Sequence, residues 1–170
     1  MNSGNKFKWV YQSLEKVLRP FGYCTGRKGF WIKNTSNSCL LIEFRKPFYG
    51  GIDGKFTIVI SVYYKTEGEV VDLKNMSFDR GHILNFGVRM LSDVPIDIES
   101  LMDMNSLVDF NERERSVETL LVSYVAPMLE KMDTISGLVE ILNEQHNLKY
   151  HITTPLQNMI HNEGYSLDFD

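Results

Sequence analysis

The chain has 170 residues, enough for one ordinary domain, and its 43% hydrophobic, 24% charged and 12% aromatic content is typical of a folded globular protein rather than a disordered one. It contains no apolar run of about 18 residues, which argues against a membrane-spanning helix, and residues 1–8 lack the apolar core of a signal peptide. We therefore expect a cytoplasmic protein with a single domain over residues 1–170.

Residues 7–18 are expected to form an amphipathic helix. Their apolar side chains recur at helical spacing and so share one face, which carries Phe7, Val10, Tyr11, Leu14, Val17 and Leu18. Pro20 should end this helix, because proline disfavours helical geometry in the residue before it. Gly22 suits a left-handed exit from the helix.

The stretch from Phe30 to Tyr64 contains three apolar runs separated by turn residues, a pattern typical of an antiparallel sheet. The first strand is expected within residues 23–33, and the polar residues 34–38 after it predict a hairpin loop. The second strand is expected over residues 39–46, because Pro47 lacks a backbone donor and should end the pairing.

The third strand, expected over residues 56–64, is fairly apolar on both faces. This indicates a central strand that is covered on at least part of each face. Beyond it the pattern weakens. Residues 69–73 favour a short strand, and residues 82–90 predict a fourth strand of the sheet.

Helical spacing returns in the second half of the chain. Residues 98–102 favour a short helix, and residues 112–132 predict a long one. Pro127 falls inside the long pattern, so we expect it to kink that helix or to split it in two. Thr134 or Ser136 can cap the helix that follows.

Near the C-terminus, Thr154 precedes Pro155, which predicts a short helix with Thr154 as its cap and proline at its first position; Gly164 should end it. Together these elements predict an α+β fold. An N-terminal helix is followed by an antiparallel meander of about four strands, and the C-terminal helices pack on the sheet.

Charge is distributed unevenly along the chain, although the net charge is only −4. Residues 1–65 carry 11 Lys and Arg against 3 Asp and Glu, a net of +8, whereas residues 66–170 carry a net of −12. Such a split is typical of a polar binding surface, but it also fits two halves that attract each other within one domain. The sequence leaves both interpretations open.

Residue types that often carry chemistry show no diagnostic spacing. Cys24 and Cys39 are expected to be reduced thiols, at least partly in the core, although a bridge would be allowed if their strands paired. The four histidines lack metal-ligand spacing, so we expect no metal and no cofactor. In the cluster Asp79-Arg80-Gly81-His82 a carboxylate could orient the imidazole as a base, but such a cluster is more often a capped turn.

The best candidate for a binding surface is a set of basic residues in the predicted sheet region: Arg27, Lys28, Arg45, Lys46 and Lys55. Aromatic residues are interleaved with them, as in platforms on which single-stranded nucleic acids stack. The same aromatics fit equally well in the core of the sheet. The chain lacks the signature of an RNA-recognition motif and its net charge is negative, so an acidic protein partner is the alternative ligand of this surface.

Several segments resemble a bacterial family of unknown function, the domain family numbered 4304. They are Leu18-Arg19-Pro20-Phe21-Gly22-Tyr23, Arg27-Lys28-Gly29-Phe30-Trp31, Leu41-Ile42-Glu43-Phe44-Arg45-Lys46, Gly54-Lys55-Phe56-Thr57-Ile58-Val59-Ile60-Ser61-Val62-Tyr63 and Val125-Ala126-Pro127-Met128-Leu129-Glu130-Lys131-Met132. Tyr23 stands where the family usually has phenylalanine, and residues 93–110 match no part of its pattern. The resemblance covers residues 7–145 and leaves 146–170 as a C-terminal extension. It implies a compact bacterial α+β domain and transfers no functional residue.

These observations lead to three functional hypotheses. The first is a non-enzymatic protein-interaction domain, immunity-like in character, whose sheet or acidic surface engages another protein. The second is a nucleic-acid-binding module that uses the basic and aromatic residues of the sheet. The third is an unrecognised enzyme that uses Asp79, Arg80 and His82. We expect no association with a membrane, and the sequence does not determine the oligomeric state.

Overall fold

The computed structural model describes residues 7–26, 29–46, 54–69 and 81–167. Its centre is one antiparallel sheet in which the strands follow one another in the order β1-β2-β3-β4-β5. The strands are β1 Cys24–Thr25, β2 Phe30–Asn34, β3 Ser38–Arg45, β4 Thr57–Tyr64 and β5 Ile83–Gly87. The helical elements are α1 Lys8–Leu18, η1 Arg19–Phe21, η2 Val88–Met90, α2 Ile98–Leu101, α3 Phe110–Leu120, η3 Leu121–Val125, α4 Ala126–Lys131, α5 Ile135–Glu144, η4 His146–His151 and α6 Thr154–Asn162. The predicted α+β meander is thus confirmed.

β3 and β4 form the longest ladder of the sheet, with Ile42 opposite Ile60. Both of these side chains belong to the main hydrophobic core. The neighbouring pair of Leu41 and Ser61, which alternation places on the other face, is also buried. The prediction that β4 is covered on both faces is therefore confirmed.

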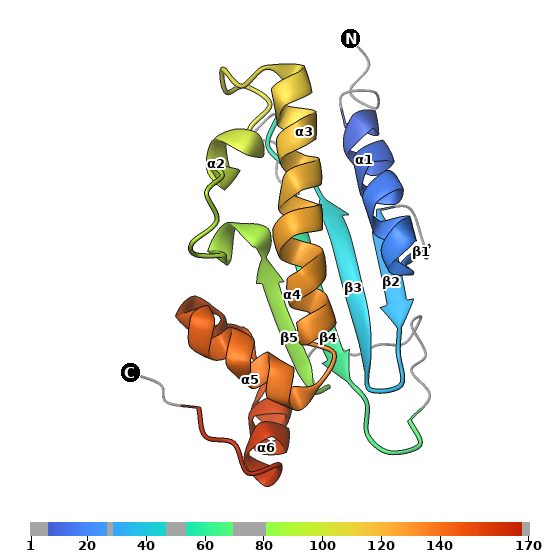
Figure 1. Cartoon of the computed structure of the whole chain (residues 1–170), viewed down its shortest axis with the longest axis vertical. Helices are drawn as coiled ribbons and strands as arrows, with labels where there is room; N and C mark the ends of the chain where they lie inside the picture. The colour runs from blue at the N-terminus through green and yellow to red at the C-terminus, as the bar shows by residue number, and fades with distance from the viewer. Residues whose placement is uncertain (1–6, 27–28, 47–53, 70–80, 168–170) are drawn as a thin grey trace.

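α1 lies beside α3, and both cover the same face of the sheet (Figure 1). α3, η3 and α4 run on without a break, and we call residues 110–131 the helical column. α1 packs its predicted apolar stripe inwards, so that Val10, Leu14 and Leu18 are fully buried. It ends before Pro20, and Gly22 has the predicted left-handed conformation, with a φ of 85°. Within the described ranges, no helix is long and apolar enough to span a membrane.

The C-terminal elements close one side of the sheet. The backbone N of Thr153 donates to Ile83 O at 2.9 Å, and Leu84 forms an isolated bridge with Ile152, so this segment pairs with the outer edge of β5. Leu148, Leu156 and Ile160 from the same segment are buried in the main core. The segment beyond residue 145 therefore packs on the same core as the preceding elements.

The sheet differs from the sequence prediction in two respects. It has a fifth strand, β1, whose two residues pair with β2. Such a strand is too short to show an alternating pattern. The predicted fourth strand ends at Gly87, and Val88–Met90 form a 3₁₀ turn instead. The short strand expected over residues 69–73 lies outside the described residues except for Glu69, which is not in a strand.

The cap of α6 and the two cysteines also differ from expectation. Thr153 rather than Thr154 is the N-cap, and its side chain accepts a hydrogen bond from the backbone N of Leu156. Cys24 is exposed rather than in the core, whereas Cys39 is buried. A bridge between them is excluded by the sheet, because β2 separates their two strands.

Candidate functional site

The basic residues expected to form a binding surface are brought together only in part. Arg27 and Lys28 lie outside the described residues. Arg45 lies opposite Thr57, so that Arg45, Lys46 and Lys55 meet where β3 ends and β4 begins. Each of these three cations already has a neighbour in the chain: Arg45 pairs with Glu43 at 2.6 Å, Lys46 Nζ lies 5.0 Å from the centre of the Phe7 ring, and Lys55 Nζ lies 3.6 Å from Asp103 Oδ2.

Three of the aromatic residues interleaved with them are core residues, while Phe48 and Tyr49 lie outside the described residues. Trp31, Phe44 and Phe56 are each at most 5% exposed. The Phe44 and Phe56 rings pack on each other at 5.6 Å, and the Trp31 indole N donates to Glu15 at 2.8 Å. A stacking platform for nucleic acids needs exposed ring faces, and these three rings do not offer them.

Part of the basic first half of the chain faces the acidic second half. Lys16 Nζ lies 2.7 Å from Glu118 Oε1, and Lys33 Nζ lies 3.6 Å from Glu130 Oε1. Lys55 and Asp103 form a third such pair. Each pair is at least partly exposed and so contributes little to stability. Together they show that the two halves neutralise each other in these places.

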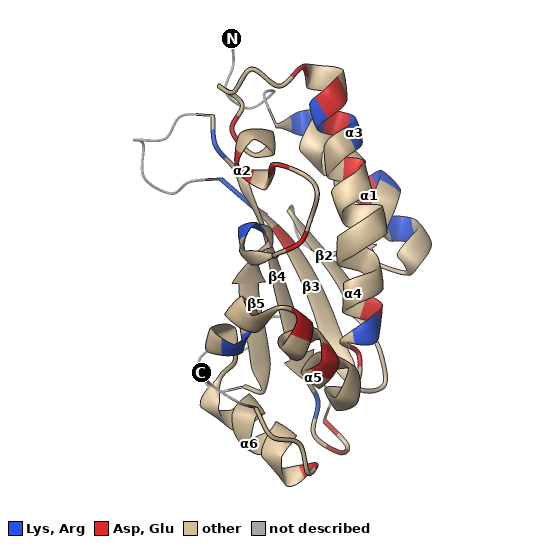
Figure 2. Ribbon diagram, turned by 60° about the vertical axis from the view of Figure 1, so that its left-hand side comes forward, with Lys and Arg blue, Asp and Glu red and all other residues tan. Residues whose placement is uncertain are grey.

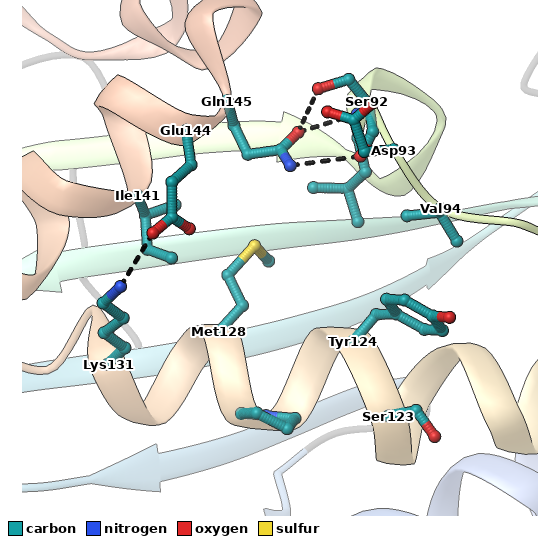
Figure 3. Close-up of a pocket in the computed structure, with 12 residues that line it drawn as sticks. Ser92, Asp93, Val94, Ser123, Tyr124, Met128, Lys131, Ile141, Glu144 and Gln145 are labelled. Carbon is teal, nitrogen blue, oxygen red and sulfur yellow. Dashed lines mark hydrogen bonds and ion pairs between the residues drawn. The ribbon is translucent and has the colours of Figure 1, made fainter.

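A pocket of about 290 Å³ opens between the helical column, α5 and the loop that precedes α2 (Figure 3). We call it the α4–α5 pocket. Its lining residues are Leu91, Ser92, Asp93, Val94, Ser123, Tyr124, Pro127, Met128, Lys131, Ile141, Glu144 and Gln145. Tyr124 and Met128 project from the column towards the loop that carries Val94. The site therefore combines apolar walls with a polar rim, the usual composition of a ligand pocket.

Gln145, the residue after α5, holds one wall of the pocket in place. Its Oε1 accepts hydrogen bonds from Ser92 N at 2.7 Å and Ser92 Oγ at 2.8 Å, and its Nε2 donates to Ser92 O at 3.1 Å. The next residue, Asp93, has a φ of 60°, which side-chain-bearing residues rarely adopt. Because the side chain of Gln145 pairs with both backbone groups of Ser92, this wall is formed before any ligand binds.

The wall contributed by the helical column contains a π-helical turn. In a regular α-helix the ring of Pro127 would clash with the carbonyl of Ser123, four residues earlier. Proline also has no N–H to donate to that carbonyl. The chain instead widens over Leu121–Val125, and the N–H of Ala126 bonds to Leu121 O, one residue further back than in an α-helix. The expected kink or split is thus a π-turn within one continuous column. π-turns are often found at functional sites, and this one supplies Ser123 and Tyr124 to the pocket.

Charged groups at the rim leave a surplus of negative charge. Lys131 Nζ lies 2.9 Å from Glu140 Oε2 and 3.0 Å from Glu144 Oε1, and these acidic positions on α5 are red in Figure 2. The hydrogen bonds with Glu140 and then Glu144 raise the pKa of Lys131, so that it stays protonated. Asp93 adds a third carboxylate, whose side chain makes no hydrogen bond or ion pair with the described residues. The pocket lining thus holds one cation, Lys131, and two carboxylates, Asp93 and Glu144, while Glu140 lies beside the pocket and shares Lys131 with Glu144.

The candidate catalytic residues of the sequence are not gathered in this pocket in the part of the chain that the structure describes. A serine nucleophile needs an adjacent base, but Ser92 Oγ donates to the amide oxygen of Gln145 instead. His82 does not line this pocket, and Asp79 and Arg80 lie outside the described residues. In the part of the chain that the structure describes, no group of three or more His, Cys, Asp or Glu side chains is arranged to hold a metal ion.

The α4–α5 pocket was not predicted from the sequence. Its residues come from three segments that meet only in the folded chain, and Ser92 and Gln145 are 53 positions apart. The one local signal was Pro127, which interrupts a helical pattern and so marks the π-turn. No sequence pattern predicts the hydrogen bonds of Gln145.

Comparison with known proteins adds no further assignment: the chain matches no protein-family model, no curated protein and no solved structure. The resemblance to the family numbered 4304 therefore stays a prediction.

Proposed function

We propose that this protein is a non-enzymatic protein-interaction domain that holds a side chain of its partner in the α4–α5 pocket. The observation that carries this proposal is the preformed pocket wall, in which Gln145 makes hydrogen bonds to both the N and the O of Ser92. A preformed site loses little conformational freedom on binding, so more of the contact energy appears as affinity.

The walls of the pocket support binding of a side chain. Met128 and Tyr124 are partly buried and pack against the main core, so they offer apolar surface held on a rigid column. Binding energy at protein interfaces concentrates where one anchor side chain fills such a pocket. The pocket of about 290 Å³ is small for a whole ligand but suits one side chain of a larger partner.

A pocket-filling variant tests the proposal. The protein is used as bait in extracts of its source cells, and a partner that binds stoichiometrically is purified and titrated by calorimetry. Met128→Trp should raise the Kd of this complex by at least about tenfold, because the indole occupies the space of the anchor. Val122→Trp is the matched control, since Val122 is exposed on the same column and does not line the pocket.

Two results would contradict the proposal. One is equal affinity of the Met128→Trp and Val122→Trp variants for the partner, with both variants folded as judged by circular dichroism. The other is turnover of a substrate by the purified protein without any stoichiometric partner. An immunity-like role is one form of the proposed function, and it further requires that the partner is a toxin whose activity the complex suppresses.

A further inference from the structure

The α4–α5 pocket also carries information about the chemistry of its occupant. Resting on the proposed function, we infer that the anchor side chain is an arginine that belongs to a basic segment of the partner protein. Two independent properties of the site lead to this inference: the balance of charge at its rim and the nature of its walls.

The rim lacks positive charge. Lys131 is shared between Glu140 and Glu144, so it neutralises only one of these two carboxylates. Asp93 is exposed at the rim, and its carboxylate makes no hydrogen bond or ion pair within the described part of the chain. Lys131 contributes one positive charge and the three carboxylates contribute three negative charges, a net charge of −2 that a second cation would reduce to −1 and an acidic anchor would raise to −3. Charge complementarity therefore favours a basic occupant.

The walls select among basic side chains. Met128 and Ile141 can cover the aliphatic stem of a long side chain, while the ring of Tyr124 offers a face to a planar cation. The guanidinium group of arginine stacks on aromatic rings, forms paired hydrogen bonds with carboxylates and is less strongly hydrated than the ammonium group of lysine. An arginine thus satisfies the apolar wall and the acidic rim at the same time.

The segment around the anchor is expected to be basic as well. Residues 66–170 carry a net charge of −12, and α5 exposes Glu140 and Glu144 next to the pocket. The cations in residues 1–65 that pair with this half, such as Lys16 and Lys33, meet it on α3 and α4 rather than on α5. The acidic face of α5 is neutralised in the described part of the chain only by Lys131, which is one cation for two carboxylates. The remaining negative charge can attract a basic segment and speed its association.

A methyl-labelling experiment tests the inference on the wild-type chain. The probes are blocked Gly-Ser peptides that carry two lysines and differ at one central residue: arginine, lysine, citrulline or glutamate. Binding is followed by the ¹³C-methyl signals of the methionines, of which Met128 lines the pocket and Met90, exposed on η2, does not. The arginine peptide should shift the Met128 signal and leave the Met90 signal in place.

The peptide series separates charge from shape. Citrulline has nearly the shape of arginine without its charge, so its peptide should bind at least about tenfold more weakly. Glu144→Gln and Asp93→Asn should each weaken the arginine peptide severalfold, whereas Glu163→Gln, which changes an exposed carboxylate outside the pocket, should not. Equal binding of the arginine, citrulline and glutamate peptides at Met128 would overturn the inference, while the proposed function would stand.

Failure of the proposed function has a different signature. In that case none of the peptides shifts the Met128 signal, and the Met128→Trp variant binds the natural partner as tightly as the wild type. A shift of Met128 by the lysine peptide that equals or exceeds the shift by the arginine peptide would also reject the arginine assignment. It would replace arginine with a lysine anchor at the same pocket.

Discussion

Ser38, the first residue of β3, donates a hydrogen bond from Oγ to Asp133 Oδ1 at 2.6 Å, across 95 residues of chain. Thr35 Oγ1 donates to the same oxygen at 2.5 Å. One carboxylate in the turn between α4 and α5 therefore holds the loop between β2 and β3. Since Ser38 is fully buried, water cannot replace this acceptor if it is lost.

The first prediction concerns this carboxylate. Asp133→Ala should lower the free energy of unfolding by about 1–3 kcal/mol, because it leaves the buried hydroxyl of Ser38 without its acceptor, whereas Thr35 Oγ1 can still donate to Ser38 O at 3.1 Å. The measurement is urea denaturation followed by circular dichroism. Glu163→Ala is the control, since Glu163 is exposed, and its effect should stay within about 0.5 kcal/mol. A loss of similar size in both variants would show that the bonds to Asp133 do not stabilise the fold.

The second prediction concerns Gly137 in α5. Alanine normally favours a helix over glycine by about 1 kcal/mol, but a Cβ at this position would lie 1.9 Å from the carbonyl O of Lys131. We therefore expect Gly137→Ala to destabilise the protein by at least about 2 kcal/mol, because the backbone must shift to admit the methyl group. In Gly87→Ala the added Cβ would meet only Thr57 Oγ1 at 3.7 Å, an ordinary contact, so this variant should cost much less. Unfolding midpoints that rank the two variants the other way would refute this reading of α5.

The third prediction is a pH dependence that involves Glu15. Hydrogen bonds from Thr25 and then Trp31 lower the pKa of this carboxyl from its usual 4.5. A carboxyl with a lowered pKa in the folded state adds stability above its unfolded pKa and loses it as the pH falls through the folded pKa. The loss of stability between about pH 6 and about pH 3 should therefore be smaller in Glu15→Gln than in the wild type.

Glu15→Gln keeps an acceptor for Thr25 and Trp31, so it tests the charge rather than the contact. The measurement is a series of denaturation curves at several pH values, with Glu163→Gln as the matched exposed carboxylate. If Glu15→Gln and Glu163→Gln lose the same amount of stability on acidification, Glu15 does not contribute to the acid dependence.

The fourth prediction uses the two thiols. Cys39 is fully buried, and this burial raises the pKa of its thiol to about 11, whereas Cys24 is exposed. Because the thiolate is the reactive form, an Ellman titration near neutral pH should detect one fast thiol in the native protein and the second only on unfolding. Cys24→Ser should remove the fast phase and leave the slow one. Two fast thiols in the wild type would contradict the packing of β3.

Elements that depend on local patterns could be predicted from the sequence, whereas those that depend on tertiary contacts could not. The α1 helix and the strands β3 and β4 were predicted close to their bounds, because alternation and helical spacing are local patterns. β1 was not predicted, because a strand of two residues is too short to show an alternating pattern. It is defined only by its pairing with β2 in the folded chain. The cap of α6 was predicted one residue late, because Thr153 and Thr154 are equally able to cap and only the backbone conformation distinguishes them.

For the basic surface, too, the sequence predicted the position of the residues but not their contacts. The sequence identified Arg45, Lys46 and Lys55 as cations near one another, and they do meet at the ends of β3 and β4. It did not show that Glu43, Phe7 and Asp103 lie against them. Nor did it indicate a pocket on the opposite, acidic half of the chain.

By itself the sequence determined the α+β architecture, the order of its strands and the division of charge between the two halves. The local spacing of apolar residues defines the apolar faces of one helix and three strands. Few folds other than this one would bury all of these faces. Only the tertiary structure decided which carboxylates neutralise the basic half and where a pocket forms. These features join residues such as Ser92 and Gln145, 53 positions apart, through hydrogen bonds whose partners are chosen by the packing of whole elements.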